Sequence, residues 1–241
     1  FPTRRSSDLV CRDTGNVAVI PNPLSFAGGA ASPQSVERLR AALGLTAGET
    51  YLFHVGGNHW YKNRPGVLRI YRALREILPA SGRAAPRLVM AGEPFTEEMR
   101  SLIGRGGLEA DVIEVVQPSD DDLRTLYSGA LALLFPSLYE GFGWPIIEAQ
   151  SCGCPVITSD RAPMTEVGGD SVVYIDPGDE AAAAAYIAAH LDDLPLLREA
   201  GERNVSRFEP GRVASQYEAF FVSAAQGRTL GVSAPGDAGR T

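Results

Sequence analysis

Two carboxylates bracket a glycine-rich turn in the segment EGFGWPIIE, residues 140–148. Glu140 and Glu148 are separated by seven residues, and the turn between them contains Gly141, Gly143 and Pro145. Carboxylates accept hydrogen bonds from hydroxyl groups, and glycines let the backbone approach a ligand closely. Free N–H groups at a helix start attract anions such as phosphate. The segment therefore predicts an anion site on a strand-to-helix loop.

Glu148 has two interpretations. Pro145 is expected at a first helical position, which places Glu148 in the first turn of the helix. There a carboxylate can accept two hydrogen bonds from a vicinal diol. Alternatively, an acid in the first turn only compensates the helix dipole, which stabilises a helix by about 0.3 to 1 kcal/mol. Taken by itself, Glu148 favours the second interpretation.

A second polar loop, GGNHWYKN, covers residues 56–63. Gly56 and Gly57 open the backbone, Asn58 offers an amide, and Lys62 brings a positive charge that suits a phosphate group. The alternative is a surface loop with a solvated lysine. Because the spacing matches neither the dinucleotide fingerprint nor the P-loop, the loop alone does not decide between them.

Other polar loops carry weaker signals. The loops 91–95 and 117–120 are placed to flank a planar group, although loop packing is the favoured explanation. Trp60 and Trp144 are aromatic candidates for stacking, with packing again favoured. His54 lies inside an apolar run and is expected to be a core histidine. The sequence contains no legible Ser/His/Asp or Cys/His arrangement for nucleophilic hydrolysis.

The elements that must position these residues follow from hydrophobic periodicity. Six apolar runs predict strands, over residues 51–55, 87–91, 112–116, 130–135, 155–159 and 171–175. Helical periods lie between them, and such alternation predicts an α/β, Rossmann-like fold with a parallel sheet and helices on both faces. Ligands of such sheets lie beyond the carboxyl ends of the strands.

Local signals set the helix boundaries. Pro65 begins a helix over 65–78 whose apolar face is predicted to comprise Val67, Leu68, Ile70, Tyr71, Leu74, Ile77 and Leu78. Thr96 is predicted to cap one helix, and Ser119 with Asp122 resembles a capping box. Further helices are expected over 33–43 and 179–193 and from Pro195 and Pro210, and a short strand over 17–25.

The chain is expected to form one domain over residues 17–222. Residues 1–16 are interpreted as a linker or a gene-assembly remnant outside the fold, because the opening FPTRRSSDL is basic and polar. Residues 223–241 are predicted to form a disordered tail, since the chain there becomes small, polar and rich in glycine and proline.

Composition narrows the function classes. The 241 residues carry a formal net charge of −7, which disfavours a nucleic-acid binder. No apolar run is long enough to span a bilayer and no signal-peptide pattern is visible, so a cytoplasmic location is expected. Cys11, Cys152 and Cys154 are too few for a disulfide framework, and a core-filling role is favoured over a metal site.

Three blocks taken together resemble a known family. They are GGNHWYKN, LYSGALALLFPSLYEGFGWPIIEAQSCGCPVITSD and APMTEVGGDSVVYIDP. They resemble the C-terminal half of retaining glycosyltransferases of the GT-B fold, family 4 (glycosyl transferases group 1), over residues 17–222. In that family this half binds the nucleotide-sugar donor.

The resemblance implies roles for individual residues. It implies that Glu140 contacts the donor sugar in the catalytic site, Glu148 the ribose and Lys62 the diphosphate. The other donor-binding residues are then Gly56, Gly57, Asn58, and the backbone groups of Gly141, Phe142 and Gly143. No cofactor and no metal is required. The implied reaction moves a sugar from a nucleoside diphosphate to a hydroxyl acceptor with retained anomeric configuration.

This sequence departs from the family pattern in two ways. Many members carry an arginine near the first loop glycine, where Gly57 and Asn58 stand here, so charge compensation rests on Lys62 or on Arg64. A complete enzyme also has a preceding domain that binds the acceptor, and this chain resembles half an enzyme. The missing half would bind an acceptor glycan or lipid-linked glycan, with peripheral membrane association of the full-length enzyme.

Three functions remain open from the sequence. The first is the donor half of a glycosyltransferase in glycan biosynthesis. The second is a stand-alone subunit that binds nucleotide sugars and needs a separate acceptor domain. The third is a GT-B-like sugar-nucleotide epimerase, for which no additional acid or base residue is legible. Neither the base nor the sugar of the donor can be predicted.

Overall fold

The computed structural model describes residues 18–24 and 29–226. The described residues fall into two compact units, one over residues 29–206 and the other over the segments 18–24 and 207–226. The first unit contains the sheet and all the candidate site residues. The predicted remnant 1–16 and residues 227–241 of the predicted tail lie outside the described residues.

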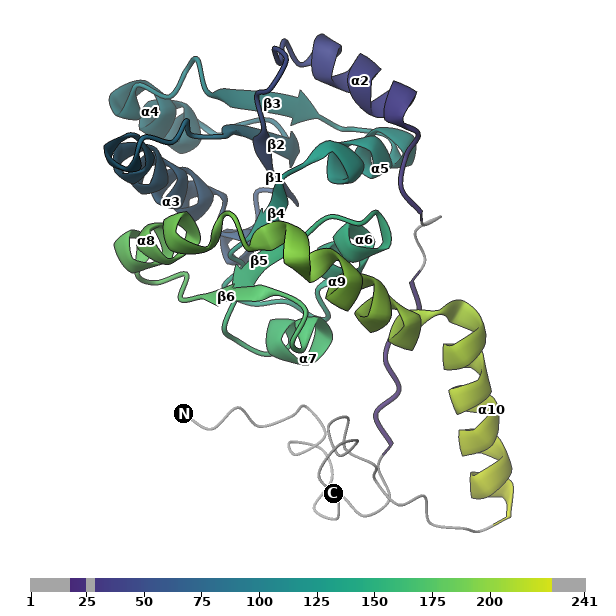
Figure 1. Ribbon diagram of the computed structural model, residues 1–241. Coiled ribbons are helices and arrows are strands. Elements are labelled where there is room, and N and C mark those ends of the chain that lie inside the picture. The colour runs from purple at the N-terminus through teal and green to yellow at the C-terminus, as the bar shows by residue number, and fades with distance from the viewer. Residues whose placement is uncertain (1–17, 25–28, 227–241) are drawn as a thin grey trace. The chain divides into compact units, whose positions relative to one another are not determined.

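The first unit is built around a parallel sheet of six strands (Figure 1). Its strand order is β3-β2-β1-β4-β5-β6, the order of the doubly wound Rossmann fold. The predicted strands are confirmed in all six places, as β1 (Tyr51–Gly56), β2 (Arg87–Gly92), β3 (Val112–Val116), β4 (Ala132–Phe135), β5 (Val156–Ser159) and β6 (Val173–Ile175).

Helices cover both faces of this sheet, as predicted (Figure 1). On one face α3 (Arg64–Ile77) contacts both α4 (Glu97–Gly106) and α8 (Glu180–His190). On the other face α5 (Asp120–Gly129) lies between α2 (Pro33–Ala42) and α6 (Trp144–Ser151), and α6 also contacts α7 (Met164–Gly168) and α9 (Leu197–Val205). The chain changes face between β3 and β4, which makes the junction of β1 and β4 the switch point of the sheet.

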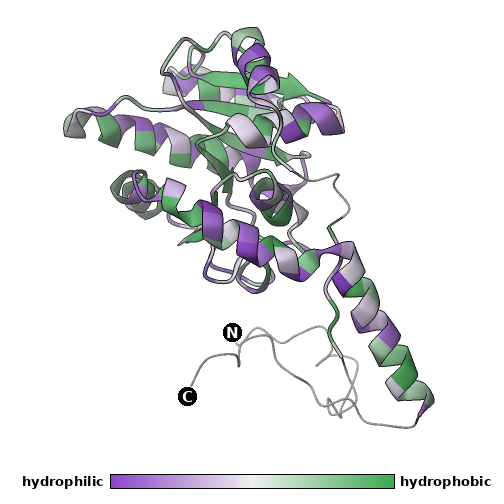
Figure 2. Cartoon of the chain, turned by 45° about the vertical axis from the view of Figure 1, so that its right-hand side comes forward, coloured by the Kyte–Doolittle hydropathy of each residue, from purple (hydrophilic) through white to green (hydrophobic). Residues whose placement is uncertain are grey.

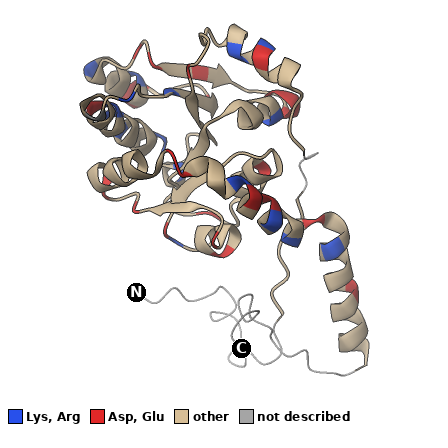
Figure 3. Ribbon diagram, viewed as in Figure 1, with Lys and Arg blue, Asp and Glu red and all other residues tan. Residues whose placement is uncertain are grey.

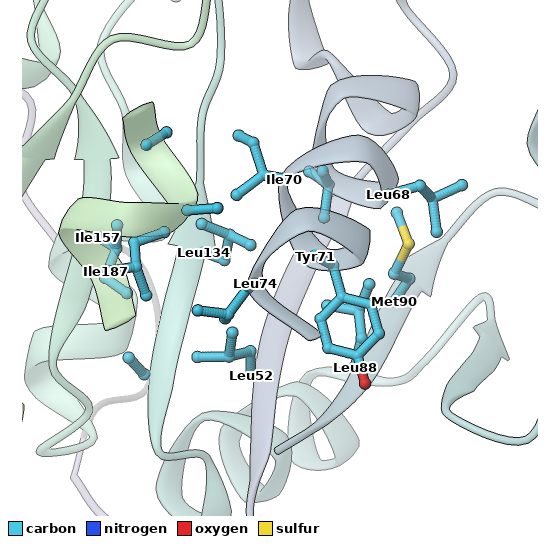
Figure 4. Close-up of a cluster of buried hydrophobic side chains, with 14 of the residues drawn as sticks. Leu52, Leu68, Ile70, Tyr71, Leu74, Leu88, Met90, Leu134, Ile157 and Ile187 are labelled. Atoms are coloured by element: carbon cyan, nitrogen blue, oxygen red, sulfur yellow. The ribbon is translucent and has the colours of Figure 1, made fainter. Parts of the chain in front are cut away.

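The interior of this unit is apolar, and its charged residues lie mainly outside the sheet. The strands and the inner sides of the helices are hydrophobic (Figure 2), whereas the charged residues belong mostly to helices and loops (Figure 3). Helix α3 packs on β1, β2 and β4 through one continuous cluster (Figure 4), in which the labelled residues are Leu52, Leu68, Ile70, Tyr71, Leu74, Leu88, Met90, Leu134, Ile157 and Ile187. Burial of such side chains is the main source of stability.

The predicted face of α3 is confirmed at all positions but one. Ile77 is 37% exposed, whereas Leu78 is fully buried. The helix ends at Ile77 and passes into a 3-10 turn over Leu78–Ser81 (η3). The tighter turn brings Leu78 into the core in place of Ile77.

The predicted helix caps are present. The side chain of Thr96 accepts from Met99 N. Ser119 and Asp122 form the reciprocal capping box at the start of α5. These short-range signals are local in sequence and therefore readable without knowledge of the fold.

The second unit differs from the sequence-based prediction. Residues 18–24 form no strand, although the segment 17–25 was predicted to be one; Val17 and Ser25 lie outside the described residues. Leu24 N donates to Phe208 O at 2.7 Å, and this backbone bond joins the segment to the chain before α10 (Pro210–Ala225). Helix α10 also makes residues 223–225 helical, where the tail was predicted to begin. Within the described residues, no helix is both long and apolar enough to cross a bilayer.

The carboxyl ends of β1 and β2 approach unusually closely. Gly56 pairs with Gly92 in the sheet, and Gly92 has a φ of +127°. A Cβ atom on Gly92 would overlap the carbonyl oxygen of Gly56. Only glycine at this position lets the loops that follow both strands leave side by side.

Gly92→Ala is expected to lower the free energy of unfolding by about 3 kcal/mol or more, because both the backbone conformation and the methyl contact are strained. Gly82→Ala is the matched control, since Gly82 has a φ of +73° but open space around it. It is expected to lose only about 1 kcal/mol. Urea unfolding of both variants tests this, and equal losses would contradict it.

Candidate donor site at the switch point of the sheet

The site lies beyond the carboxyl ends of β1 and β4, which are parallel neighbours at the switch point of the sheet. The loop after β1 leads into α3 on one face, and the loop after β4 leads into α6 on the other. Leu138 N donates to Tyr61 O at 2.7 Å and ties the two loops together. This geometry brings two predicted residues, 78 positions apart, into contact.

Lys62 and Glu140 form an ion pair. Lys62 Nζ donates to Oε1 of Glu140 at 2.9 Å and to Oε2 at 3.0 Å. The side chain of Lys62 is 18% exposed and that of Glu140 is 8% exposed. The ammonium also lies 5.3 Å from the centre of the Phe135 ring. Glu140 is thus a buried carboxylate whose charge is balanced by the neighbouring ammonium.

Lys62 is the only lysine in the 241-residue sequence, in which all the other basic side chains are arginine or histidine. An ammonium is a compact donor that directs hydrogen bonds to more than one acceptor from a single point, which a planar guanidinium does not do.

Asn63 sets the path of the loop that carries Lys62. The 3-10 turn η2 (Trp60–Lys62) ends at Asn63, which has a φ of +53°. Its Nδ2 donates to Pro136 O at 3.0 Å, and a Cβ on Gly66 would overlap the Asn63 side chain. Sequence reasoning missed Asn63, although asparagine is among the residues that tolerate this left-handed conformation.

Arg64 braces the loops that follow β1 and β2. It is 1% exposed, and its Nη1 donates to Asn58 Oδ1 and, at 2.7 Å, to Glu93 O. Nε and Nη2 have no hydrogen-bond partner among the described residues, and the guanidinium lies 5.5 Å from the Phe95 ring. Burial lowers the pKa of Arg64 below its ordinary value. Its buried position favours a structural role for Arg64 over the alternative of direct charge compensation.

Asn58 makes hydrogen bonds to the loop that follows β2. Its backbone N–H donates to Glu93 Oε2 at 2.6 Å, and its Nδ2 donates to Pro94 O at 2.8 Å. Gly57 lies beside the same carboxylate, since a Cβ there would be 3.4 Å from Glu93. The loop 91–95 is therefore brought against the loop 56–58, as neighbouring parallel strands require.

The glycine turn opens directly into α6. Gly143 is the N-cap of this helix with a φ of +108°, and no side chain caps it. Phe142 packs edge-on against Trp144 with ring centres 5.2 Å apart. Gly141 is exposed and has no neighbour within 4 Å of a built Cβ position. The turn thus leaves open space beside an uncapped helix start, which is a favourable environment for an anion.

The prediction that Glu148 lies in the first turn of α6 is wrong. The helix begins at Trp144, one residue before Pro145, so Glu148 falls in the second turn and the first turn contains no acid. The interpretation as dipole compensation therefore loses its basis, because that effect fades beyond the first turn. Glu148 instead accepts a hydrogen bond at Oε2 from Tyr127 Oη at 2.9 Å. Burial raises the pKa of this carboxyl above its ordinary value.

Other candidates have structural roles. His54 is fully buried, its Nδ1 lies 2.9 Å from Leu134 O, and burial lowers its pKa to about 3, which confirms a neutral core histidine. Cys152 and Cys154 are buried free thiols. Trp60 differs from them: packing was the favoured explanation for it, but the residue is 75% exposed. In the part of the chain that the structure describes, no group of three or more His, Cys, Asp or Glu residues could hold a metal ion.

Comparisons with known proteins identify sequences and structures that this chain resembles. The sequence pattern of the glycosyl transferases group 1 matches residues 35–207. The O-antigen chain mannosyltransferase B of Escherichia coli is 36% identical over 61% of this chain and 38% of its own length. The GDP-mannose:cellobiosyl-diphosphopolyprenol alpha-mannosyltransferase of Xanthomonas oryzae is 30% identical over 71% of this chain and 46% of its own length.

A solved structure has the same fold. The crystal structure of Anabaena HepE in complex with UDP and glucose superposes with a TM-score of 0.68 at 21% identity, covering 80% of this chain and 53% of that protein. The chain thus spans roughly two-fifths to half the length of the proteins that it matches.

Lys62→Met removes the ammonium and is expected to lower the free energy of unfolding by about 2 kcal/mol or more, because Glu140 is left without its cation. Glu140→Gln is expected to cost less. In the double variant the total loss should be smaller than the sum of the two, by about 1 kcal/mol or more. Urea unfolding of the four proteins measures this coupling, and strictly additive losses would show that the ion pair contributes nothing.

Glu148→Gln is expected to stabilise the ligand-free protein at neutral pH. Because the pKa of Glu148 is raised on folding, the native protein loses stability as the pH rises from the ordinary glutamate value to the raised one, and that loss persists above it. Glutamine does not ionise and avoids the loss. When unfolding is measured from pH 4 to pH 8, the free energy of unfolding of Glu148→Gln minus that of the native protein should increase as the pH rises. A constant difference over this range would contradict a raised pKa.

Proposed function

Because this chain belongs to the glycosyl transferases group 1, we propose that it is the donor-binding half of a retaining, family 4 glycosyltransferase. It would transfer a sugar from a nucleoside diphosphate to a hydroxyl acceptor. The observation that carries this proposal is the convergence of Lys62, Glu140 and the uncapped start of α6 beyond β1 and β4. An anionic donor with several hydroxyl groups fits these three features together.

Each residue then has a role in donor recognition. Lys62 turns from Glu140 to the diphosphate when the donor binds, and Gly141, Phe142 and Gly143 present backbone N–H groups to it. Glu140, released from Lys62, accepts hydrogen bonds from the sugar hydroxyls and orients the sugar. Glu148 accepts from the ribose, while Gly56, Gly57 and Asn58 form the wall of the site next to β2.

The transfer step follows from this arrangement. The bond between the anomeric carbon and the diphosphate oxygen breaks, and a bond from the same carbon to the acceptor oxygen forms on the same face. The acceptor proton passes to an oxygen of the leaving diphosphate. Lys62 and the backbone N–H groups stabilise the charge that develops on that diphosphate. We assign no role to a metal or cofactor, and Glu140 orients the sugar without acting as a nucleophile.

The relatives suggest which donor to test first. The two relatives in the comparison are mannosyltransferases, and the name of one specifies GDP-mannose. We therefore propose a hexose donor with GDP-mannose as the first candidate, and UDP-glucose as the second because the structural neighbour binds UDP and glucose.

We propose that the acceptor is bound by a part of the protein corresponding to the length of the relatives that this chain does not match. We propose an acceptor glycan or lipid-linked glycan bound by an N-terminal domain, with peripheral membrane association of the complete enzyme. Because the chain spans only 38% and 46% of the two mannosyltransferases, a second candidate is a donor-binding subunit that works with a separately encoded acceptor domain. Both candidates share the donor site.

Donor binding is expected to stabilise the chain against heat. At a concentration 100 times its dissociation constant, the correct donor should add about 2.7 kcal/mol. Thermal unfolding with GDP-mannose, UDP-glucose and ADP-glucose measures this. In Lys62→Met the stabilisation by the same donor should fall strongly.

The control is Arg75→Ala, which breaks an ion pair of 2.9 Å with Asp111. Asp111 lies just before β3, at the amino ends of the parallel strands, whereas the site lies beyond the carboxyl ends. This variant should keep the full donor-induced stabilisation. Absence of any shift with all three donors at millimolar concentration would overturn the proposed function.

A further inference from the structure

Tyr127 is a buried residue of α5 that contacts the site without reaching its surface. Its side chain is fully buried, and its hydroxyl donates to Oε2 of Glu148 on α6 at 2.9 Å. Phe53 of β1 packs edge-on against the Tyr127 ring, with ring centres 5.0 Å apart and planes at 85°. The ring is therefore fixed from the sheet, and its hydroxyl fixes one oxygen of a carboxylate on the next helix.

The other oxygen of Glu148 is differently placed. Among the described residues, Oε1 receives no hydrogen bond, while the residue as a whole is half-buried. A carboxylate whose one oxygen is occupied by an internal donor offers the second in a single orientation. Without that internal bond, rotation about the terminal side-chain torsion is broad and roughly two-fold.

We propose that Tyr127 is a positioning residue for donor recognition, which holds Glu148 so that Oε1 faces the vicinal hydroxyl groups of the nucleoside ribose. This inference rests on the proposed function, specifically on the role of Glu148 toward the ribose. Tyr127 acts through Glu148 and touches neither the sugar nor the diphosphate.

The hydroxyl is suited to this role because it remains protonated. Burial, together with the neighbouring Glu148 carboxylate, raises the pKa of Tyr127 well above its ordinary value. Tyr127 is therefore a permanent donor toward Glu148. The bond to Oε2 favours the ionised form of Glu148, which is the form that accepts hydrogen bonds from hydroxyl groups.

The charge state of Glu148 follows from all the groups that face it. Burial raises its pKa most, the hydrogen bond from Tyr127 lowers it, Asp120 at the start of α5 raises it, and Lys62 lowers it. The remaining titratable groups around this helix contact are Arg124 of α5, Cys152 and Cys154. Removal of the Tyr127 hydroxyl takes away a lowering contribution, so the pKa of Glu148 should rise further in Tyr127→Phe.

Two changes in nucleotide binding follow. Whichever of GDP, UDP and ADP binds the native chain most tightly serves as the probe, together with its 2′,3′-dideoxy form. Tyr127→Phe should bind the ribonucleotide roughly fivefold to tenfold more weakly at pH 7 and discriminate less against the dideoxy form, as expected when a hydroxyl-binding site is disturbed. As the pH falls, protonation of Glu148 should weaken ribonucleotide binding, and in Tyr127→Phe this loss of affinity should begin at a higher pH. Calorimetry from pH 5 to pH 8 measures it.

Tyr71→Phe is the matched control. Tyr71 of α3 is also fully buried, and its hydroxyl donates to Pro86 O at 2.8 Å, far in sequence from Glu148 and on the other face of the sheet. It loses one buried hydroxyl bond and a comparable amount of stability. Tyr71→Phe should bind the ribonucleotide with the affinity of the native chain, discriminate equally against the dideoxy form, and lose affinity over the same acidic pH range.

Glu148→Gln separates this inference from the proposed function. If Glu148→Gln binds the ribonucleotide as tightly as the native chain, the ribose role in the proposed function fails. If Glu148→Gln weakens binding but Tyr127→Phe behaves like Tyr71→Phe, the positioning role of Tyr127 is overturned. In a background that already contains Glu148→Gln, the addition of Tyr127→Phe should weaken binding little further, and a fully additive loss would also overturn it.

A ligand-free readout completes the test. In protein carrying carbon-13 at the glutamate carboxyl carbons, the Glu148 signal, assigned by its loss in Glu148→Gln, should titrate at a higher pH in Tyr127→Phe than in the native chain and Tyr71→Phe. An unchanged titration would contradict the inference even if no nucleotide binds, whereas absence of nucleotide binding by the native chain overturns the proposed function.

Discussion

The ion pair between Lys62 and Glu140 is the interaction around which the site is organised. It exists because β1 and β4 are parallel neighbours whose following helices lie on opposite faces of the sheet. The two loops must part at this point, and each contributes one charge to the space between them. A cation and an anion that neutralise each other there hold the two loops together in the ligand-free chain.

A second contact layer supports this pair from inside the protein. Arg64 braces the loops after β1 and β2, and Tyr127 reaches Glu148 from the neighbouring helix. Both side chains are buried, and both end on a group that faces the site. The precision of such a site depends on these internal bonds as much as on the residues that meet the ligand.

Much of the fold was predictable because its signals are local. The six strands followed from short apolar runs, and the caps at Thr96 and Ser119 followed from side chains within one turn of the backbone that they bind. The errors occurred where context decides. Residues 18–24 have strand-like composition but no ladder partner, and the start of α6 at Trp144 moved Glu148 into the second turn. The contact between Lys62 and Glu140 needed the strand order, and the contact between Tyr127 and Glu148 needed the packing of α5 on α6.

Lys62 has one more consequence because no other lysine occurs in the chain. Among the side chains of the printed sequence, Lys62 is therefore the one that a reagent for primary amines can modify. A ligand that covers Lys62 would slow the reaction of its amino group with such a reagent, and no other side chain of the sequence would react. If the proposed donor covers Lys62, the extent of acylation at this single side chain becomes a chemical readout of donor binding.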